Sequence, residues 1–172
     1  MGADLVKFPS LHPGVDCINA VLLSSIIFTR ADISDNKWLF TKRKIMIVVY
    51  GIKENLNPIK KKLSGVIHDC MQSVLGMPED KRAHRFIPMN KEDFYYPGGR
   101  SNAYTVIEIN MMQGREKETQ KFLIKSLFEH IDKEIGISPV DIEITIKEQQ
   151  PHCWGFRGIT GDEAKLNYKI NV

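Results

Sequence analysis

Three arginines stand in settings from which a guanidinium group can bind a small anion. Arg115 follows Gly114 at a predicted turn between a strand and a helix, where the first amide groups of the helix would help it to hold a carboxylate. Arg100 lies in a loop with paired glycines, and Arg157 lies among aromatic residues and glycines near the C-terminus. For each arginine, the alternative is an exposed helix end or a surface ion pair.

His84 is a candidate base, since the ordinary pKa of histidine is near 6.5. It stands next to Arg85 on a predicted strand, and side chains alternate along a strand, so at most one of the two can point into a shared pocket. A structural role for His84 is the alternative. Tyr95 and Trp154 would either wall a substrate pocket or anchor an interface. No residues show the spacing of a metal site, and we expect neither a metal nor a cofactor.

A near-repeat with a spacing of 60 residues organises the elements that must position these side chains. Gly76 is matched by Gly136, and Leu63 is matched by Leu123. Each copy reads as a strand, a helix, a tight turn and a second strand, which is a βαβ unit. We expect the first helix to begin at Asn57-Pro58, and each helix to end at its glycine.

Two tandem βαβ units, in residues 45–89 and 104–148, predict an α+β fold with a four-stranded mixed sheet and two helices on one face. Residues 45–172 form this domain, with a C-terminal hairpin and tail over 149–172. Residues 1–44 lie outside the repeat and are expected to form an irregular extension. The strands are too apolar for the uncovered sheet face to stay wet, which indicates oligomerisation.

Composition excludes several classes of protein. The net charge of the 172 residues is only +3, far from the strongly basic balance of a nucleic-acid-binding protein. Three scattered cysteines do not make a disulfide framework, and the apolar run 20–28 is too short to span a bilayer. We therefore expect a cytoplasmic protein without a nucleic-acid or membrane partner.

The arrangement resembles the tautomerase superfamily, which includes oxalocrotonate tautomerase, malonate semialdehyde decarboxylase and macrophage migration inhibitory factor. The resemblance covers about residues 45–160 and rests on the tandem βαβ halves together with three short segments. These segments are Gly76-Met77-Pro78-Glu79, Gly114-Arg115 and Trp154-Gly155-Phe156-Arg157-Gly158, the last being similar to the family's aromatic-glycine hairpin.

The resemblance implies a homotrimer that acts on a small carboxylate substrate. In that family a proline at the mature N-terminus, on the first strand, is the general base or acid for a carbon beside a carbonyl, and arginines bind the substrate carboxylate. Here the strand opens with Lys44-Ile45-Met46-Ile47, and Glu54-Asn55 replaces the first Gly-Arg turn. A chain beginning at Met46 would carry a primary α-amine there, with an ordinary pKa of about 7.7–8.0.

The sequence leaves several functions in competition. The first is a tautomerase or isomerase that moves a proton beside the carbonyl of a small 2-oxo or enol carboxylic acid; decarboxylase and hydratase variants belong to the same class. Its site would contain Arg115, a base from Met46 or His84, and Arg100 or Arg157. The second is a non-catalytic relative that binds ligands or serves as a scaffold. A third, an RNA-binding βαβ module, lacks the exposed aromatic and basic pattern that base stacking requires.

Overall fold

The computed structural model describes residues 44–163. The predicted extension over residues 1–44, except for Lys44, and the end of the C-terminal tail, residues 164–172, lie outside the described residues. Within the described range, no helix is long and apolar enough to cross a membrane.

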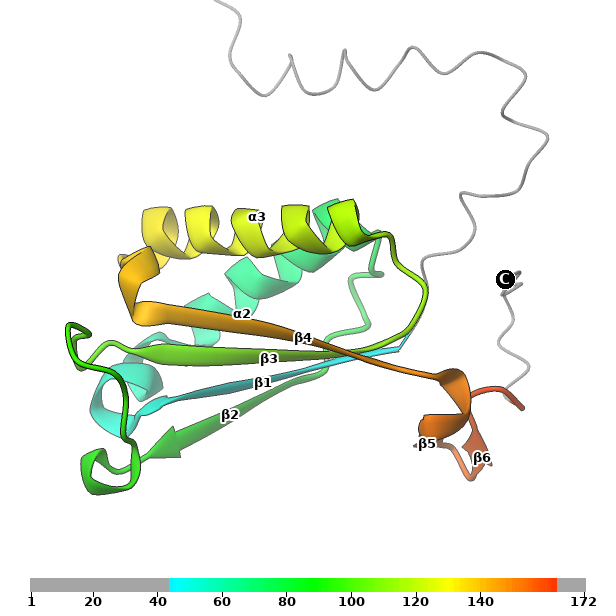
Figure 1. Ribbon diagram of the computed structural model, residues 1–172, viewed down its shortest axis with the longest axis horizontal. Coiled ribbons are helices and arrows are strands. Elements are labelled where there is room, and N and C mark those ends of the chain that lie inside the picture. The colour runs from blue at the N-terminus through cyan, green and yellow to red at the C-terminus, as the bar shows by residue number, and fades with distance from the viewer. Residues whose placement is uncertain (1–43, 164–172) are drawn as a thin grey trace, which may run out of the picture. The chain divides into compact units, whose positions relative to one another are not determined.

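Each half of the described chain forms a strand, a long helix and a second strand (Figure 1). Short 3-10 turns follow β2 and flank β4, and a small hairpin closes the described chain. The elements are β1 (Ile45–Ile52), α2 (Lys53–Leu75), β2 (His84–Met89), η2 (Lys91–Asp93), β3 (Thr105–Met112), α3 (Lys117–Ile135), η3 (Pro139–Asp141), β4 (Ile142–Gln149), η4 (Pro151–Cys153), β5 (Gly155–Phe156) and β6 (Ile159–Thr160).

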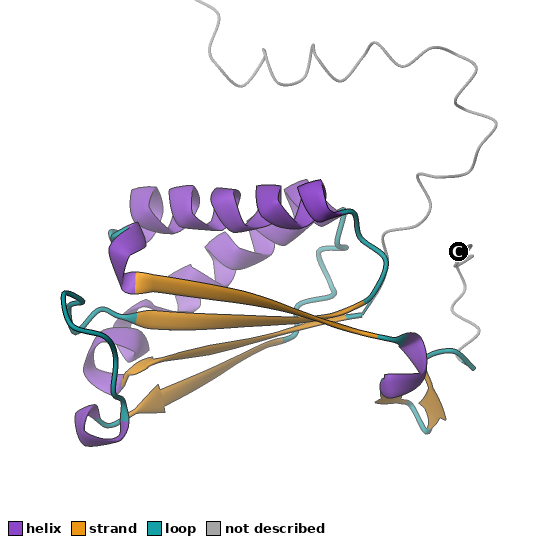
Figure 2. Cartoon of the chain, viewed as in Figure 1, coloured by secondary structure: helices purple, strands orange, loops and turns teal. Residues whose placement is uncertain are grey.

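The four long strands form one mixed sheet in the order β2-β1-β3-β4. The pairs β1–β2 and β3–β4 are parallel, as a βαβ crossover requires, while β1 and β3 are antiparallel in the centre. Both helices lie on the same side of the sheet (Figure 2). The predicted α+β fold of two tandem βαβ units is confirmed.

The two halves are related by a pseudo-twofold axis. The bounds of β1 and β3, the ends of α2 and α3, and the turns η2 and η4 all differ by 60 residues. Val48 pairs with Glu108 across β1 and β3, and these two residues are also counterparts in the two halves. The axis therefore passes between Val48 and Glu108.

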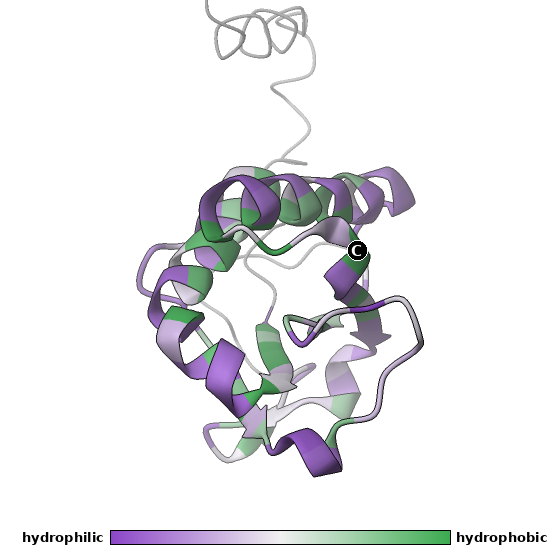
Figure 3. Ribbon diagram, turned by 90° about the vertical axis from the view of Figure 1, so that its left-hand side faces the viewer, coloured by the Kyte–Doolittle hydropathy of each residue, from purple (hydrophilic) through white to green (hydrophobic). Residues whose placement is uncertain are grey.

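The core lies between the sheet and the helices. Every second residue of the central strands, such as Ile47 and Ile109, is buried against helical side chains such as Leu63 and Leu127. Seen along the sheet, the helices carry apolar residues inward and polar residues outward (Figure 3). This packing fixes which strand residues face the helices and which face the open side of the sheet.

The open sheet face is mixed rather than uniformly apolar. Glu108 accepts a hydrogen bond from the Tyr50 hydroxyl at 3.4 Å and pairs with Lys147 at 2.6 Å. Beside this polar group, Val48 is already buried within one chain, whereas Ile87 is exposed. The open face thus combines exposed apolar surface with a charged centre.

Both helices end at the predicted glycines. Gly76 and Gly136 adopt left-handed φ values of 62° and 81°, and their amides donate to carbonyls of the last helical turn. The predicted start of the first helix is wrong: α2 begins at Lys53, and Pro58 lies inside it. Pro58 is the sixth residue of α2, so it removes one intrahelical hydrogen bond, the one to the Glu54 carbonyl.

Candidate functional site

The sheet has two chemically different ends. The starts of β1 and β2, the ends of β3 and β4 and residues 150–163 make up the first, which we call the hairpin end. The ends of β1 and β2, the starts of β3 and β4 and residues 90–104 make up the second, the loop end (Figure 1).

The residues predicted for the site divide between these two ends. Five of them lie at the hairpin end: Met46, His84, Arg115, Trp154 and Arg157.

The other two, Tyr95 and Arg100, lie at the loop end. The ends are separated by the length of β3, eight residues at about 3.3 Å each, or about 26 Å. One chain therefore does not bring all seven residues together.

Arg115 is fixed in the turn between β3 and α3. Gly114 takes a φ of 114°, which turns the chain away from the strand, and Arg115 Nη1 donates to the Met112 carbonyl at 3.2 Å. Gln120 donates its side-chain amide to the Arg115 carbonyl at 3.2 Å, and Nε and Nη2 of the guanidinium are buried. The Met112 amide donates to the Lys44 carbonyl at 3.1 Å, so this turn lies beside the start of β1.

The segment after β4 packs against the same place. The amide of Gly161 donates to the Trp154 carbonyl at 2.7 Å. A Cβ on Gly161 would lie 2.7 Å from the Met112 side chain and 3.2 Å from the Trp154 Cβ. Trp154 and the Met112 side chain thus meet at Gly161, and Met112 in turn holds Arg115.

Trp154 has a buried hydrogen-bond donor. Its indole Nε1 has no hydrogen-bond partner within the part of the chain that the structure describes. Buried donors in proteins are nearly always paired, so an unpaired one next to a candidate site calls for an acceptor from a ligand or water.

Arg157 occupies the tip of the hairpin. Arg157 and Gly158 have φ values of 54° and 80°, the two positive values of a two-residue turn between β5 and β6. The Arg157 side chain is exposed at this tip. On the neighbouring β5, the Phe156 ring lies 5.6 Å from the Lys44 ammonium, which ties the hairpin to the start of β1.

His84 faces the helices. Its Nδ1 lies 2.9 Å from the Ser64 hydroxyl of α2, and its ring packs edge-on against His68 at 5.9 Å. Burial, His68 and Arg82 together lower the pKa of His84 from 6.5 to about 4, so the ring is neutral near pH 7.

Met46 faces the other side of the sheet. Its sulfur contacts the guanidinium of Arg85, which is exposed on the open face. Alternation along β2 therefore gives Arg85 and not His84 to the face of Met46. Sequence reasoning left this choice open, because Phe86 and Ile87 place one large apolar side chain on each face of β2 and give no signal that decides it.

The loop end carries an aromatic cluster. The rings of Tyr96 and Tyr104 stack at 5.3 Å, and Phe94 contacts both. Burial, followed by the hydrogen bond to Glu143, raises the pKa of Tyr104 to about 12. Tyr95 is not part of this cluster, since it is 91% exposed.

Arg100 lies on an anchored loop. The Asp141 carboxylate accepts hydrogen bonds from the Ser101 amide at 2.7 Å and from its hydroxyl at 2.6 Å. These bonds lower the pKa of Asp141 and fasten the loop to η3. Arg100 itself is exposed. Tyr95 and Arg100 therefore point toward solvent at the loop end and do not contribute to the hairpin end of the same chain.

The described residues offer no group of three or more histidine, cysteine or acidic side chains placed to hold a metal ion. The cations and the neutral donor at the hairpin end are Lys44, Arg85, Arg115 and Trp154. Carboxylates lie there too, since Glu148 accepts a hydrogen bond from the Gly114 amide at 3.3 Å and Glu163 accepts one from the Thr160 hydroxyl at 2.7 Å. The guanidinium groups and the indole donor are the groups of this end that can bind a carboxylate.

A family model described as tautomerase enzyme matches residues 81–157. The chain is also 28% identical to the probable tautomerase YusQ of Bacillus subtilis (strain 168) over 101 residues, which are 56% of this chain and 80% of that protein. Both matches support the tautomerase superfamily as the family of this chain.

Solved structures of this superfamily share the fold. A malonate semialdehyde decarboxylase is 20% identical and matches with a TM-score of 0.59 over 64% of this chain and 89% of its own. A fused 4-OT, solved as an asymmetric trimer, is 19% identical, with a TM-score of 0.61 over 68% and 96%. A macrophage migration inhibitory factor-like protein from Entamoeba histolytica is 18% identical, with a TM-score of 0.55 over 67% and 97%.

Proposed function

We propose that this tautomerase-superfamily chain is an enzyme that moves a proton beside the carbonyl of a small 2-oxo or enol carboxylic acid. One observation carries the proposal. The hairpin end gathers the Arg115 guanidinium and the unpaired indole donor of Trp154 beside the start of β1. The similarity of the chain to the superfamily supports the class of reaction, and these residues support the class of substrate.

Arg115 is assigned to the substrate carboxylate. Its position in the turn is held by the Met112 carbonyl and the backbone around Gly114, so little side-chain freedom is lost when an anion binds. Trp154 Nε1 is assigned to an oxygen of the substrate, where a donor stabilises the charge of an enolate. Arg85 is exposed on the face of Met46 and adds a second cation.

The base is assigned to the α-amine of a chain that begins at Met46. An amine there would lie at the start of β1, close to the Arg115 turn. By the resemblance of the sequence to the superfamily, this is the position of the family's catalytic proline. Neighbouring guanidinium groups disfavour the ammonium form and lower the pKa of such an amine, which suits a general base.

His84 is the other candidate base, and its surroundings favour a structural role. It faces α2, on the opposite side of the sheet from Met46, and hydrogen-bonds to Ser64. With a pKa of about 4, it is neutral at pH 7 but a weak proton acceptor. We therefore place it second.

Tyr95 and Arg100 can contribute to the proposed site only if several copies of the chain assemble. They are exposed at the loop end, about 26 Å from Met46, so only a neighbouring copy can supply them to the hairpin end. A trimeric relative, the fused 4-OT, supports association of this fold, and the exposed Ile87 on the open face gives it apolar surface to bury. We propose a homotrimer.

Three versions of the chain test the function: the full chain, a chain that begins at Met46, and the same shorter chain with Met46→Pro. Each is assayed for ketonisation of enol-phenylpyruvate and 2-hydroxymuconate. We expect activity from the Met46 chain, more from the proline chain, and loss of both on Arg115→Ala. Proton transfer at C3 is checked by deuterium exchange. Inactivity of the correctly folded proline chain would refute the proposed enzyme.

The non-catalytic alternative is favoured by one observation: in the full chain the nitrogen of Met46 is a peptide nitrogen inside β1 and cannot accept a proton. A ligand-binding or scaffold protein would keep the anion site without the base. Binding of phenylpyruvate by the full chain, abolished by Arg115→Ala, with no exchange at C3 in any version, would select this function.

A further inference from the structure

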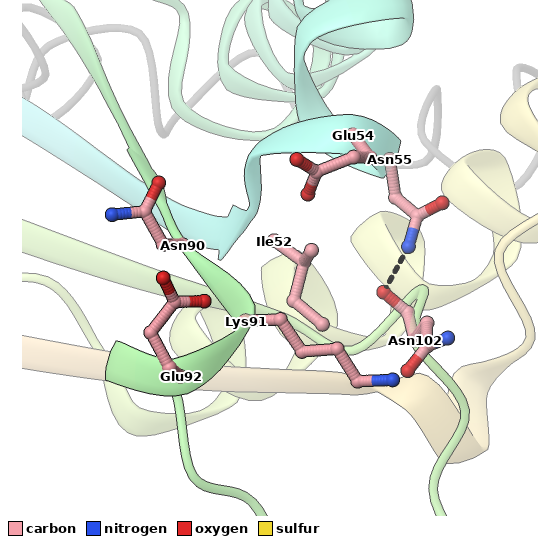
Figure 4. A pocket seen from close by; sticks show the side chains of 7 residues that line it. All are labelled: Ile52, Glu54, Asn55, Asn90, Lys91, Glu92 and Asn102. Atoms are coloured by element: carbon pink, nitrogen blue, oxygen red, sulfur yellow. Dashed lines mark hydrogen bonds between the residues drawn. The ribbon is translucent and has the colours of Figure 1, made fainter.

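A hollow at the loop end lies where the pseudo-twofold axis places the counterpart of the Arg115 turn. It encloses about 420 Å³, which is within the range of small-molecule sites. Its lining combines one buried apolar side chain with six exposed polar ones (Figure 4). The lining residues are Ile52, Glu54, Asn55, Asn90, Lys91, Glu92 and Asn102.

The charged side chains of the hollow have no partner among the described residues. Glu54, Lys91 and Glu92 make no hydrogen bond or ion pair within residues 44–163. Figure 4 shows the Lys91 side chain reaching toward Asn102, while the two carboxylates lie on the other side of Ile52. The hollow is therefore polarised, with acids at one side and an ammonium at the other.

The amides reinforce this polarity. The side-chain NH₂ of Asn55 donates to the Asn102 carbonyl, and that of Asn90 donates to Asp93 at 3.1 Å. With their NH₂ groups engaged, Asn55 and Asn90 offer carbonyl oxygens as acceptors. Because Asn55 stands at the counterpart of Arg115, the hollow also lacks the guanidinium that makes the hairpin end a site for anions.

We propose that this hollow binds a small zwitterion, an α-amino acid. The ammonium group would lie between Glu54 and Glu92, the carboxylate would meet the Lys91 ammonium, and the apolar side chain would cover Ile52. Two groups of opposite charge on one small molecule suit a hollow that has acids on one side of Ile52 and an ammonium on the other. A 2-oxo acid offers only the anionic half of this match.

Titration calorimetry on the full chain tests the proposal with three probes of one skeleton. These are leucine, 4-methyl-2-oxopentanoate, which lacks the ammonium, and 3-methylbutylamine, which lacks the carboxylate. We expect leucine to bind with a Kd on the order of 1 mM and both analogues to bind about two- to fivefold more weakly, since each loses the exposed ion pairing of one of its charged groups.

Substitutions then locate the site. Glu92→Gln and Lys91→Met should each weaken leucine binding about two- to fivefold, while the matched changes Glu129→Gln and Lys125→Met on α3 leave it unchanged. The proposal is overturned if leucine does not bind, if either analogue binds as tightly, or if the first pair of variants binds like the parent. If the oxo acid binds and Arg115→Ala abolishes this binding, the oxo acid occupies the hairpin end. That result tests the proposed enzyme and not the hollow.

Discussion

Asn55 and Arg115 are counterparts in the two halves, each three residues beyond the end of a central strand, yet they make opposite kinds of site. Asn55 lies in the first turn of α2, and its NH₂ group donates a hydrogen bond to the Asn102 carbonyl. Arg115 precedes α3 in a turn opened by Gly114 and brings a permanent positive charge. The duplicated fold therefore carries one end suited to anions and another suited to mixed charge.

Arg115→Ala is expected to lower kcat/KM for an enol carboxylic acid about 100-fold or more, because it removes the cation that holds the carboxylate and the developing charge. Arg115→Lys should recover part of the loss, since it keeps the charge without the planar fork. Lys117→Ala, at the exposed first residue of α3, is the matched control. Steady-state kinetics of the active version of the chain decide the matter, and equal losses in both alanine variants would contradict the assignment.

Stability is expected to fall as the pH drops from 6.5 toward 4. The folded chain lowers the pKa of His84 to about 4, mainly through burial, while the unfolded chain takes up its proton near 6.5. Between these values the unfolded state binds the extra proton and is favoured. Urea denaturation across this window should show the slope, and His84→Phe should flatten it. An unchanged slope in His84→Phe would assign the acid sensitivity to other groups.

Gly136→Ala is expected to destabilise the fold by about 1 kcal/mol, because the C-cap position has a φ of 81° and an alanine there is strained. No neighbouring atom lies within 4 Å of an added Cβ, so the cost is purely conformational. Gly65→Ala inside α2 meets no atom within 4 Å either, and it should stabilise the helix by about 0.5–1 kcal/mol. Urea melts of the two variants should move in opposite directions; movement in the same direction would show that space and not φ governs these glycines.

Gly161→Ala is expected to detach the hairpin from the end of β3. An added Cβ would lie 2.5 Å from the Pro151 carbonyl oxygen and 2.7 Å from the Met112 side chain, and the carbonyl cannot yield as a flexible side-chain tip does. Trp154 fluorescence, read in a Trp38→Phe background, should shift to the red as the indole meets water. Gly155→Ala has open space around its Cβ and should leave the emission unchanged. The packing argument fails if the two variants emit alike.

Periodicity made the fold predictable because the two halves repeat the same pattern. The apolar spacing that includes Leu63 and Leu123 and the terminal glycines Gly76 and Gly136 gave both helices, and the crossover rule then fixed parallel pairing within each half. The start of α2 was missed, because Asn57-Pro58 is a good cap in isolation. Packing of Leu56 into the core extends the helix past it.

The candidate site was only partly predictable. Strand alternation separated His84 from Arg85 but did not say which of them faces the helices, since that depends on which parity of β2 is buried. The unpaired donor of Trp154 was also beyond reach, because burial of one indole nitrogen depends on how the hairpin folds back past Met112. Contacts between segments far apart in the chain decide such details.

Val48 and Glu108 meet at the axis, and a symmetric dimer of half-length chains could not make this pairing. Two separate half-length chains, associated as a symmetric pair, would have to place the same side chain on both sides of the axis. Two glutamates there would repel each other, and two valines would leave Tyr50 and Lys147 without their shared acceptor. A single chain that contains both halves is free of this constraint, so it can hold a carboxylate opposite a valine at the axis.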